Sequence, residues 1–406
     1  MHHEKRQRPR KLVLRNIGLM LSGDLAQPIL DADTIVALDG LISAVGRGND
    51  IDVEDPDVLI DARGCAVAPG LIDSHVHPVF GDWTPRQNQL GWIESAMNGG
   101  VTTMISAGEF HLPGRPRDIV GLKALAITAQ RAFSAVRFGG VKLIAGAPVL
   151  EKGLTEGDFA ELSAAGVTLL GEIGLGSVKT GSLASQMVVW ARKYGLQSTI
   201  HTGGPSTPGS HYIDKDIVLE ADPDIIGHIN GGHTALPLDQ IRCLCEGCRR
   251  GLELVHNGNE RAALYAARTA RELGQLDRVI LGTDSPAGSG VQPTGILRML
   301  ALLSSLGEFP AEQAFCFATG NTARLRNLNS GLIAAGRAAD FVLLGKAQHS
   351  SGSDLLDSMN KGDLPGIGMV IIDAVVHCLR SRNTPPAERL PEILRNAPPP
   401  STAVPH

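Results

Sequence analysis

Short apolar runs rich in Val, Ile and Leu recur through the middle of the chain, and each follows a glycine or a polar turn. Eight such runs lie at 71–76, 101–106, 141–147, 167–173, 197–201, 224–228, 252–256 and 279–284. Between them, stretches such as 121–138, 183–194 and 260–273 carry apolar residues at intervals of three and four, which is typical of amphipathic helices. Strand and helix patterns that alternate in this way indicate parallel βαβ units. The eight repeats therefore predict an α/β protein whose centre, residues 70–329, is a (β/α)8 TIM barrel.

The two ends of the chain differ from its centre because helical patterns are scarce there. Strand-like runs separated by Asp-Gly, Gly and Pro turns lie at 12–21, 34–45, 58–67, 330–344 and 369–379. We therefore expect residues 1–69 and 330–382 to pair into one small β-sandwich domain beside the barrel. Residues 383–406 are rich in proline and predict a tail that lies on the surface or is disordered, with an arm over a neighbouring subunit as the alternative.

Composition excludes several classes of protein. The 406 residues are 43% hydrophobic and 19% charged, which suits a large buried core and not a disordered chain. The formal net charge is −5, without the basic stripe that nucleic-acid binding needs. No apolar segment approaches the ~20 residues of a membrane span, and no apolar signal region follows the basic residues at 5–11. We expect a cytoplasmic protein with no nucleic-acid or membrane partner.

His75 and His77 end the first predicted barrel strand. Side chains two residues apart on a strand project from the same face, so both imidazoles can reach one metal ion. Taken alone, the pair fits two ordinary core or surface histidines equally well, because histidine serves in both ways. The pair is therefore half of a candidate metal site, and the rest of the chain has to supply the other half.

Other ligand-type residues stand in or at the ends of later strands, where TIM-barrel active sites are built. The full set is His75, His77, Glu172, His201, His228 and Asp284. Successive βα units take about 30 residues, and the steps from Glu172 to His201 and on to His228 are 29 and 27 residues. We therefore predict a two-metal centre. One ion would take His75, His77 and Asp284. The other would take His201 and His228, with Glu172 as the bridging ligand.

Imidazole and carboxylate ligands favour zinc or ferrous iron, with manganese and cobalt as alternatives. Two such ions about 3.5–4 Å apart would generate a bridging hydroxide near neutral pH and polarise a carbonyl, which predicts hydrolysis. Asp284 is the candidate catalytic residue, because a ligand beside the hydroxide can accept its proton and pass it to a leaving nitrogen. Each residue alone has an ordinary alternative, such as a hydrogen-bonded core histidine or a carboxylate that caps a helix.

Several stretches resemble the amidohydrolase superfamily. They are the run 69–77, the strand-end histidines 201 and 228, the Gly-Thr-Asp sequence at 282–284 and the run 335–342. Many members carry a carboxylated lysine as the bridging ligand on strand 4, whereas this chain has Glu172, and the alternative bridge Lys179 lies past the strand end. Further stretches resemble the branch of the superfamily that opens a cyclic amide, at 84–87, 99–107, 111–117, 201–204, 227–232 and 382–386.

The resemblance implies a small-molecule substrate. Hydrolysis of the C–N amide bond of 6-oxo-1,4,5,6-tetrahydronicotinate, followed by loss of ammonia, would give 2-formylglutarate. The resemblance also implies a homo-oligomer, with a tetramer as the expected form. A substrate carboxylate needs a cationic partner, and Arg86, soon after the first barrel strand, is the candidate because a guanidinium pairs well with a carboxylate. The alternative for Arg86 is a solvated loop position.

His111 follows the predicted strand at 101–106, and His256 ends the one at 252–256. Both are further candidates for contacting substrate, whereas His211 and His233 fit loop positions better. The cysteines at 243, 245 and 248 fit a barrel helix, because no second cluster completes a four-ligand metal or iron–sulfur site.

Other functions stay open. The same centre could act on another lactam, imide, hydantoin or amidine, or could belong to a deaminase, although deaminases of the superfamily generally use one ion. A scaffold without catalysis is the remaining alternative.

Overall fold

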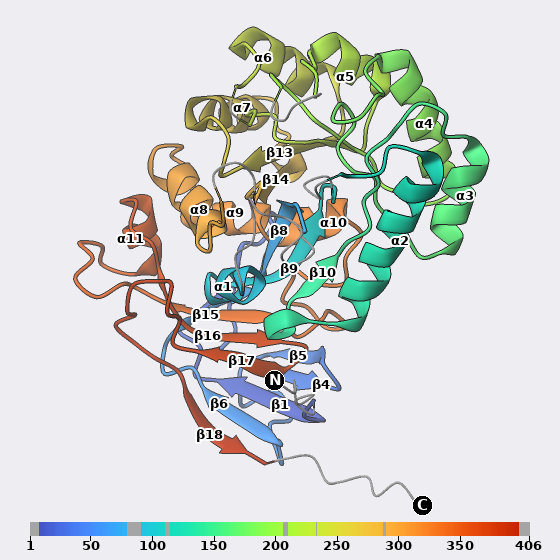
Figure 1. Cartoon of the computed structure of the whole chain (residues 1–406). Coiled ribbons are helices and arrows are strands. Elements are labelled where there is room, and N and C mark those ends of the chain that lie inside the picture. The colour runs from blue at the N-terminus through green and yellow to red at the C-terminus, as the bar shows by residue number, and fades with distance from the viewer. Residues whose placement is uncertain are drawn as a thin grey trace, which may run out of the picture.

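The computed structural model describes residues 8–78, 91–109, 114–205, 210–232, 234–286 and 290–397. These residues form the mixed α/β fold that the sequence predicts. Parallel strands surrounded by helices make up the upper part of Figure 1, and two further sheets lie below them. The first and last described strands, β1 (Lys11–Arg15) and β18 (Glu392–Asn396), both lie in the lower part.

Seven parallel strands occupy the centre of the upper part. They are β8 (Leu71–Val76), β9 (Val101–Ser106), β10 (Lys142–Ile144), β11 (Thr199–Ile200), β12 (Ile225–Ile226), β13 (Gly251–Val255) and β14 (Val279–Gly282). They form one sheet in the order β10-β9-β8 and another in the order β11-β12-β13-β14. The predicted strand at 167–173 is not continuous, since only Leu169 and Ile173 form bridges, both parallel and both to the segment that contains β11.

Backbone hydrogen bonds join the two parallel sheets at both sides. The amide of Asp284 donates to the carbonyl of His75 at 2.9 Å, which links the ends of β14 and β8. On the other side, the amide of Gly171 donates to the carbonyl of Pro148 at 2.9 Å, just beyond β10. All eight predicted runs therefore lie beside their neighbours in chain order. Their carboxyl ends face the same way, which brings residues from distant parts of the chain together.

Helices follow the parallel strands and cover them on the outside (Figure 1). They are α1 (Trp92–Asn98), α2 (Ile119–Ala135), α3 (Glu156–Ala164), α4 (Gly181–Lys193), α5 (Lys215–Ala221), α6 (Leu238–Gly247), α7 (Glu260–Glu272), α8 (Gly295–Ser305), α9 (Ala311–Phe317) and α10 (Gly320–Leu325). The short helix α11 (Leu355–Asn360) packs against α8 and α9 instead. Side chains cap the starts of some of these helices: Asp118 accepts from the amide of Gly121 to begin α2, and Asn259 accepts from the amide of Ala262 to begin α7. One face of α7 is buried and consists mostly of alanines, so this helix packs closely.

The chain ends form two sheets. The first has the order β18-β6-β1-β4-β5 and the second β17-β16-β15-β7-β2-β3. The remaining strands are β2 (Leu19–Leu21), β3 (Ile29–Leu30), β4 (Thr34–Leu38), β5 (Leu41–Gly46), β6 (Val58–Asp61), β7 (Ala66–Pro69), β15 (Phe341–Gly345), β16 (Gly366–Ile372) and β17 (Val375–Leu379). The N-terminal strand β7 pairs antiparallel with the C-terminal strand β15. Apolar side chains of both sheets, among them Leu12, Ile60, Phe341 and Met369, share one buried cluster.

The proline-rich segment 383–406 contains more structure than its composition suggests. Residues Glu392–Asn396 form β18, which pairs antiparallel with β6 at the edge of the first sheet. Ile393 packs against the buried cluster of the two sheets, and this contact explains why the pairing forms at an otherwise open edge. Residues 398–406 lie outside the described part of the chain.

A buried ion pair connects the parallel strands to the sheets of the chain ends. Lys142 of β10 donates from Nζ to both carboxylate oxygens of Asp340, at 2.9 and 2.7 Å, and its Nζ also lies 2.7 Å from Asp373. Burial, with the nearby charge of Asp373, raises the pKa of Asp340, while Lys142 opposes that rise. The ammonium group therefore compensates two carboxylates at the junction.

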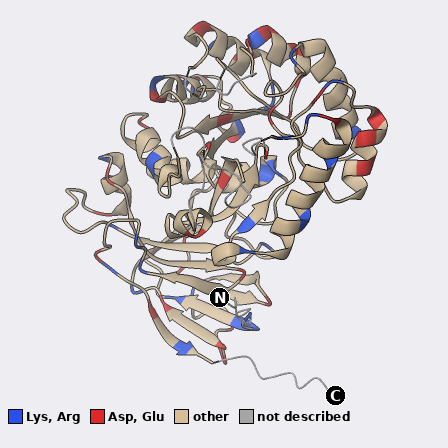
Figure 2. Ribbon diagram, viewed as in Figure 1, with Lys and Arg blue, Asp and Glu red and all other residues tan. Residues whose placement is uncertain are grey.

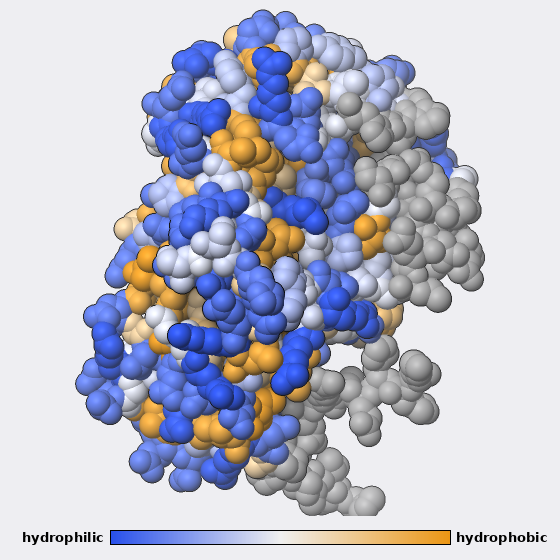
Figure 3. Space-filling view, turned by 90° about the vertical axis from the view of Figure 1, so that its left-hand side faces the viewer, coloured by the Kyte–Doolittle hydropathy of each residue, from blue (hydrophilic) through white to orange (hydrophobic). Residues whose placement is uncertain are grey.

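Charged and apolar residues are both spread over the described surface in the views shown. Lys and Arg are interspersed with Asp and Glu around the outer helices in Figure 2. The face shown in Figure 3 carries several apolar patches separated by polar residues. Within the described ranges, no helix is both long enough and apolar enough to cross a membrane.

Candidate active site

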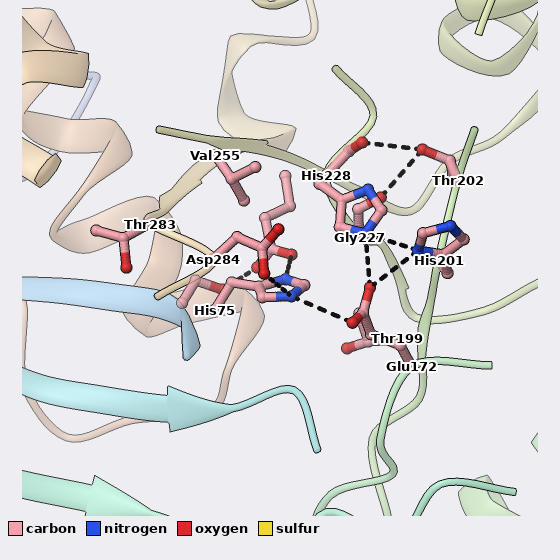
Figure 4. Close-up of polar contacts among 12 residues, drawn as sticks. His75, Glu172, Thr199, His201, Thr202, Gly227, His228, Val255, Thr283 and Asp284 are labelled. Atoms are coloured by element: carbon pink, nitrogen blue, oxygen red, sulfur yellow. Dashed lines mark hydrogen bonds and ion pairs between the residues drawn. The ribbon is translucent and has the colours of Figure 1, made fainter. Parts of the chain in front are cut away.

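All six predicted ligand residues meet at the carboxyl ends of the parallel strands, and Figure 4 labels five of them, all but His77. His75 lies in β8 and His77 just after it, while Glu172 lies between the two bridging residues of its segment. His201, His228 and Asp284 directly follow β11, β12 and β14, each within two residues of the strand end. The six side chains are buried, and Asp284 is the most accessible at 8% exposure. The structure therefore brings together residues that are up to 209 positions apart in the chain.

Glu172 lies between two pairs of histidines. Its Oε2 is 3.5 Å from Nε2 of His75 and 3.6 Å from Nε2 of His77. Its Oε1 is 2.7 Å from Nε2 of His228 and 3.7 Å from Nδ1 of His201. In Figure 4, His201 and His228 point toward one side of the carboxylate, and His75 with Asp284 lies on the other. One oxygen thus faces each pair, as a bridging carboxylate requires.

Asp284 completes the side of the site that contains His75 and His77. Its Oδ1 lies 3.0 Å from Nε2 of His77 and 3.7 Å from Nε2 of His75. The backbone of Asp284 has a φ of 58°, a left-handed conformation that costs energy in a residue with a side chain. Asn257 stabilises it by donating from Nδ2 to the carbonyl of Asp284 at 2.9 Å. The surrounding strands therefore hold this carboxylate in a strained position that faces the histidines.

Hydrogen bonds on the far side of the rings set which nitrogens face the centre. His77 donates from Nδ1 to the carbonyl of Gly108 at 3.0 Å, and His201 donates from Nε2 to the carbonyl of Gly204 at 2.9 Å. Nδ1 of His75 lies 2.6 Å from a carboxylate oxygen of Glu253. When the ring is neutral, a histidine that donates from this nitrogen carries its lone pair on the opposite nitrogen, which faces Glu172.

The donor set fits divalent metal ions. Three groups, His75-His77-Glu172, His75-His228-Asp284 and Glu172-His201-His228, each place their ligand atoms within 4.8 Å of one another. Nε2 of His75 is buried yet has no hydrogen-bond partner among the residues that the structure describes. Buried polar atoms are rarely left in this state, and a coordinated cation would satisfy this nitrogen.

The electrostatics of the cluster agree with this conclusion. Burial favours the neutral form of Glu172, but the facing imidazoles of His75 and His228 lower the pKa of Glu172 well below its usual value. Burial likewise lowers the pKa of His75, but the carboxylates of Glu172 and Glu253 raise it well above its usual value. Positive charge at the centre therefore stabilises the ionised carboxylates, and a bound divalent cation would supply this charge.

The other predicted residues have different outcomes. His256 is half-buried at the end of β13, and burial together with Arg298 lowers the pKa of His256. It does not belong to the three ligand groups found among the described residues. Arg86, His111 and His233 lie outside the described residues. Lys179 is exposed, whereas the buried Glu172 faces both pairs of histidines.

The cysteine cluster lies on or beside α6, away from the ligand groups. Cys243 is exposed, whereas Cys245 and Cys248 are buried and all three are free thiols. Burial raises the pKa of Cys245 to about 11. Burial also raises the pKa of Cys248, so these two buried thiols stay protonated near neutral pH, as packed side chains do.

Several buried polar residues that support the site were not predicted. Asp73 accepts from the amide and the hydroxyl of Thr283, at 2.8 and 2.6 Å, and so ties β8 to the residue before Asp284. Glu253 and Arg326 form a buried ion pair at 3.0 Å behind His75. A glutamate inside the apolar run of β13 was a visible signal for Glu253. Arg326 lies outside every strand pattern and gave no such signal.

Comparisons with known proteins identify the family. A model described as the amidohydrolase family matches residues 253–376. The chain is 46% identical over 385 residues to enamidase of Eubacterium barkeri, an alignment that covers 95% of this chain and 100% of that enzyme. The chain belongs to the amidohydrolase superfamily. The crystal structure of enamidase, described as a new member of that superfamily, matches this amidohydrolase with a TM-score of 0.92 over 95% of this chain and 100% of that one.

More distant relatives agree with the superfamily assignment. A β-aspartyl dipeptidase from Fervidobacterium islandicum is 18% identical and shares the fold, with a TM-score of 0.63 over 92% of this chain and 97% of that one. Adenine deaminase of Mesorhizobium japonicum is 25% identical over 83% of this chain and 54% of that enzyme. The similarity to enamidase is much higher and covers its full length. This amidohydrolase is therefore an enamidase-like hydrolase that acts on a cyclic C–N amide bond.

The close approach of β14 to His75 gives a first test. A Cβ at Gly282 would lie 2.6 Å from Cβ of His75, so Gly282→Ala must displace β8 or β14. We expect this substitution to destabilise the fold by about 1–3 kcal/mol through overpacking, and to reduce metal binding. Thermal unfolding and metal analysis would measure the two effects. Gly157→Ala is the control, because its nearest neighbour would be 3.7 Å away. Normal metal binding in Gly282→Ala would contradict this account of how His75 is positioned.

Proposed function

We propose that this amidohydrolase hydrolyses the ring amide of 6-oxo-1,4,5,6-tetrahydronicotinate at a centre of two divalent ions, zinc or iron with manganese or cobalt as alternatives. One water would add at the ring carbonyl and break its bond to the ring nitrogen. A second water would then release ammonia from the resulting enamine and leave 2-formylglutarate. The single observation that carries the proposal is the position of Glu172, with one oxygen toward each pair of histidines.

The six ligand residues divide between the two ions in this proposal. His75, His77 and Asp284 would hold one of them. His201 and His228 would hold the other, and Glu172 would contact both. Ions in these positions polarise a carbonyl and lower the pKa of water.

Asp284 has the catalytic role in the proposal. Its carboxylate would accept the proton of the attacking water and deliver it to the ring nitrogen as the C–N bond breaks. Burial alone would raise the pKa of Asp284, but the contacts with His77 and His75 outweigh burial and lower this pKa below its usual value. The carboxylate is therefore ionised and can accept a proton.

The substrate would be oriented by residues on the loops after the strands. We infer that Arg86, after β8, pairs with the ring carboxylate and that His111, after β9, lies near the ring. His256 at the end of β13 would contact the substrate or the groups around it. These roles rest on strand order, because active sites of such proteins form at the carboxyl ends of the strands.

The proposal extends to architecture and assembly. We infer that residues 70–329 form a (β/α)8 barrel, which is supported by the parallel neighbours in chain order. We infer that residues 1–69 and 330–382 form a β-sandwich, which is supported by the buried cluster that both sheets share. A cytoplasmic location and a homo-oligomer, with a tetramer as the expected form, complete the proposal.

The two-ion centre predicts a metal content that depends on Glu172. Purified protein should contain close to two ions per chain by elemental analysis. Glu172→Gln should lose metal and at least about 100-fold of activity together, because several kcal/mol of charge stabilisation are removed. Lys179→Ala is the control, since this exposed residue is the alternative bridge and should be dispensable. Full activity in a metal-free protein would refute the proposal.

The substrate can be tested by proton NMR of the reaction mixture. Incubation with 6-oxo-1,4,5,6-tetrahydronicotinate should consume the ring signals and produce 2-formylglutarate with one ammonia per ring. The matched control is the same lactam without its carboxylate, 3,4-dihydropyridin-2(1H)-one, which should react more slowly. Reaction of only other lactams, imides, hydantoins or amidines would move the assignment to those rings. Ammonia release from adenine without ring opening would instead indicate a deaminase.

A further inference from the structure

The four histidines of the site differ in what contacts the ring nitrogen that points away from Glu172. For His77 and His201 the contacts are the neutral carbonyls of Gly108 and Gly204. Nδ1 of His228 is buried without a hydrogen-bond partner in the part of the chain that the structure describes. His75 instead donates from Nδ1 to the carboxylate of Glu253, at 2.6 Å. The two sides of the site are therefore not equivalent.

The carboxylate of Glu253 is held in its ionised form. It is fully buried, and Arg326, whose side chain is 2% exposed, donates from its terminal nitrogen to Oε1 of Glu253 at 3.0 Å. Ser74 donates from Oγ to the same oxygen. This leaves Oε2 for His75, so both carboxylate oxygens are used. A buried carboxylate with a cation and a hydroxyl on one oxygen is a fixed acceptor for His75.

Arg326 anchors this group to several strands. It donates from Nε to Oγ of Ser74 and from a terminal nitrogen to the carbonyl of Ser74, both at 3.0 Å, and so contacts β8. It also donates to Oγ1 of Thr199 in β11, at 3.2 Å. With Glu253 in β13, the guanidinium joins three strands beneath the site. Because buried ion pairs contribute little net stability, a role in shaping the site explains this pair better than a role in folding.

A carboxylate behind a metal-bound histidine fixes the orientation of its ring and raises the basicity of its other nitrogen. We propose that Glu253, held by Arg326, makes the ion position of His75, His77 and Asp284 bind a divalent cation more tightly than the position of His201 and His228. Glu253 and Arg326 are positioning residues that act through His75. This inference rests on the proposed two-ion centre.

Metal titration of chelator-treated protein tests the inference. Calorimetry with Zn²⁺ should resolve two sites of unequal affinity in the wild type. Glu253→Gln keeps the size of the side chain and an oxygen acceptor but removes the charge. This substitution should weaken the tighter site by about 10- to 100-fold and leave the weaker site unchanged. Asp340→Asn is the control, because Asp340 is another buried carboxylate with a cationic partner, the Lys142 ammonium group, and it lies outside the site. It should bind both ions as the wild type does.

A double variant separates charge from structural damage. Glu253→Gln leaves Arg326 without its carboxylate, whereas Glu253→Gln with Arg326→Met removes both charges and should recover thermal stability. The affinity loss should persist in the double variant if the charge acts through His75. Recovery of affinity together with stability would overturn the inference, and so would two wild-type sites of equal affinity. Fewer than two ions in the wild type would contradict the proposed two-ion centre itself.

Discussion

Glu172 places one carboxylate oxygen toward His75 and His77 and the other toward His201 and His228. The rest of the site depends on this contact, because the Glu172 carboxylate lies within 3.7 Å of a nitrogen of each of the four histidines. The carboxylate is buried and would be neutral if it were isolated, yet the imidazoles around it keep it ionised. This mutual dependence of charges makes the cluster a cation-binding centre and not a set of separately packed core residues.

The strands make that contact possible. Glu172 lies on a segment that pairs with the segment of β11 through two isolated bridges instead of a continuous strand. His75 lies in β8 with His77 just after it, and Asp284 follows β14. Asp73 and the hydrogen bond from Asp284 to His75 hold β14 against β8, and Gly282 allows the two strands to approach closely. The ligands therefore reach the centre because backbone hydrogen bonds and buried polar contacts fix the strands that carry them.

The sequence was informative where a chemical pattern coincided with a strand end. His75 and His77 are two apart on a strand, and Glu172, His201 and His228 are spaced by one βα unit each, so all of them could be placed in advance. Glu253 stood out as a glutamate inside an apolar run, but its role and that of Arg326 could not be placed, because both depend on a contact between residues 73 positions apart. The strand β18 was missed because pairing with β6 outweighed the proline-rich composition around it. Arg86 and His111 remain predictions about loops, whose structure depends little on the strand pattern.

X-ray diffraction with anomalous scattering at the metal absorption edges tests the central claim most directly. The account predicts two peaks, one beside His75, His77 and Asp284 and the other beside His201 and His228, with the Glu172 carboxylate between them. A single peak, or two peaks of which neither contacts Glu172, would contradict it.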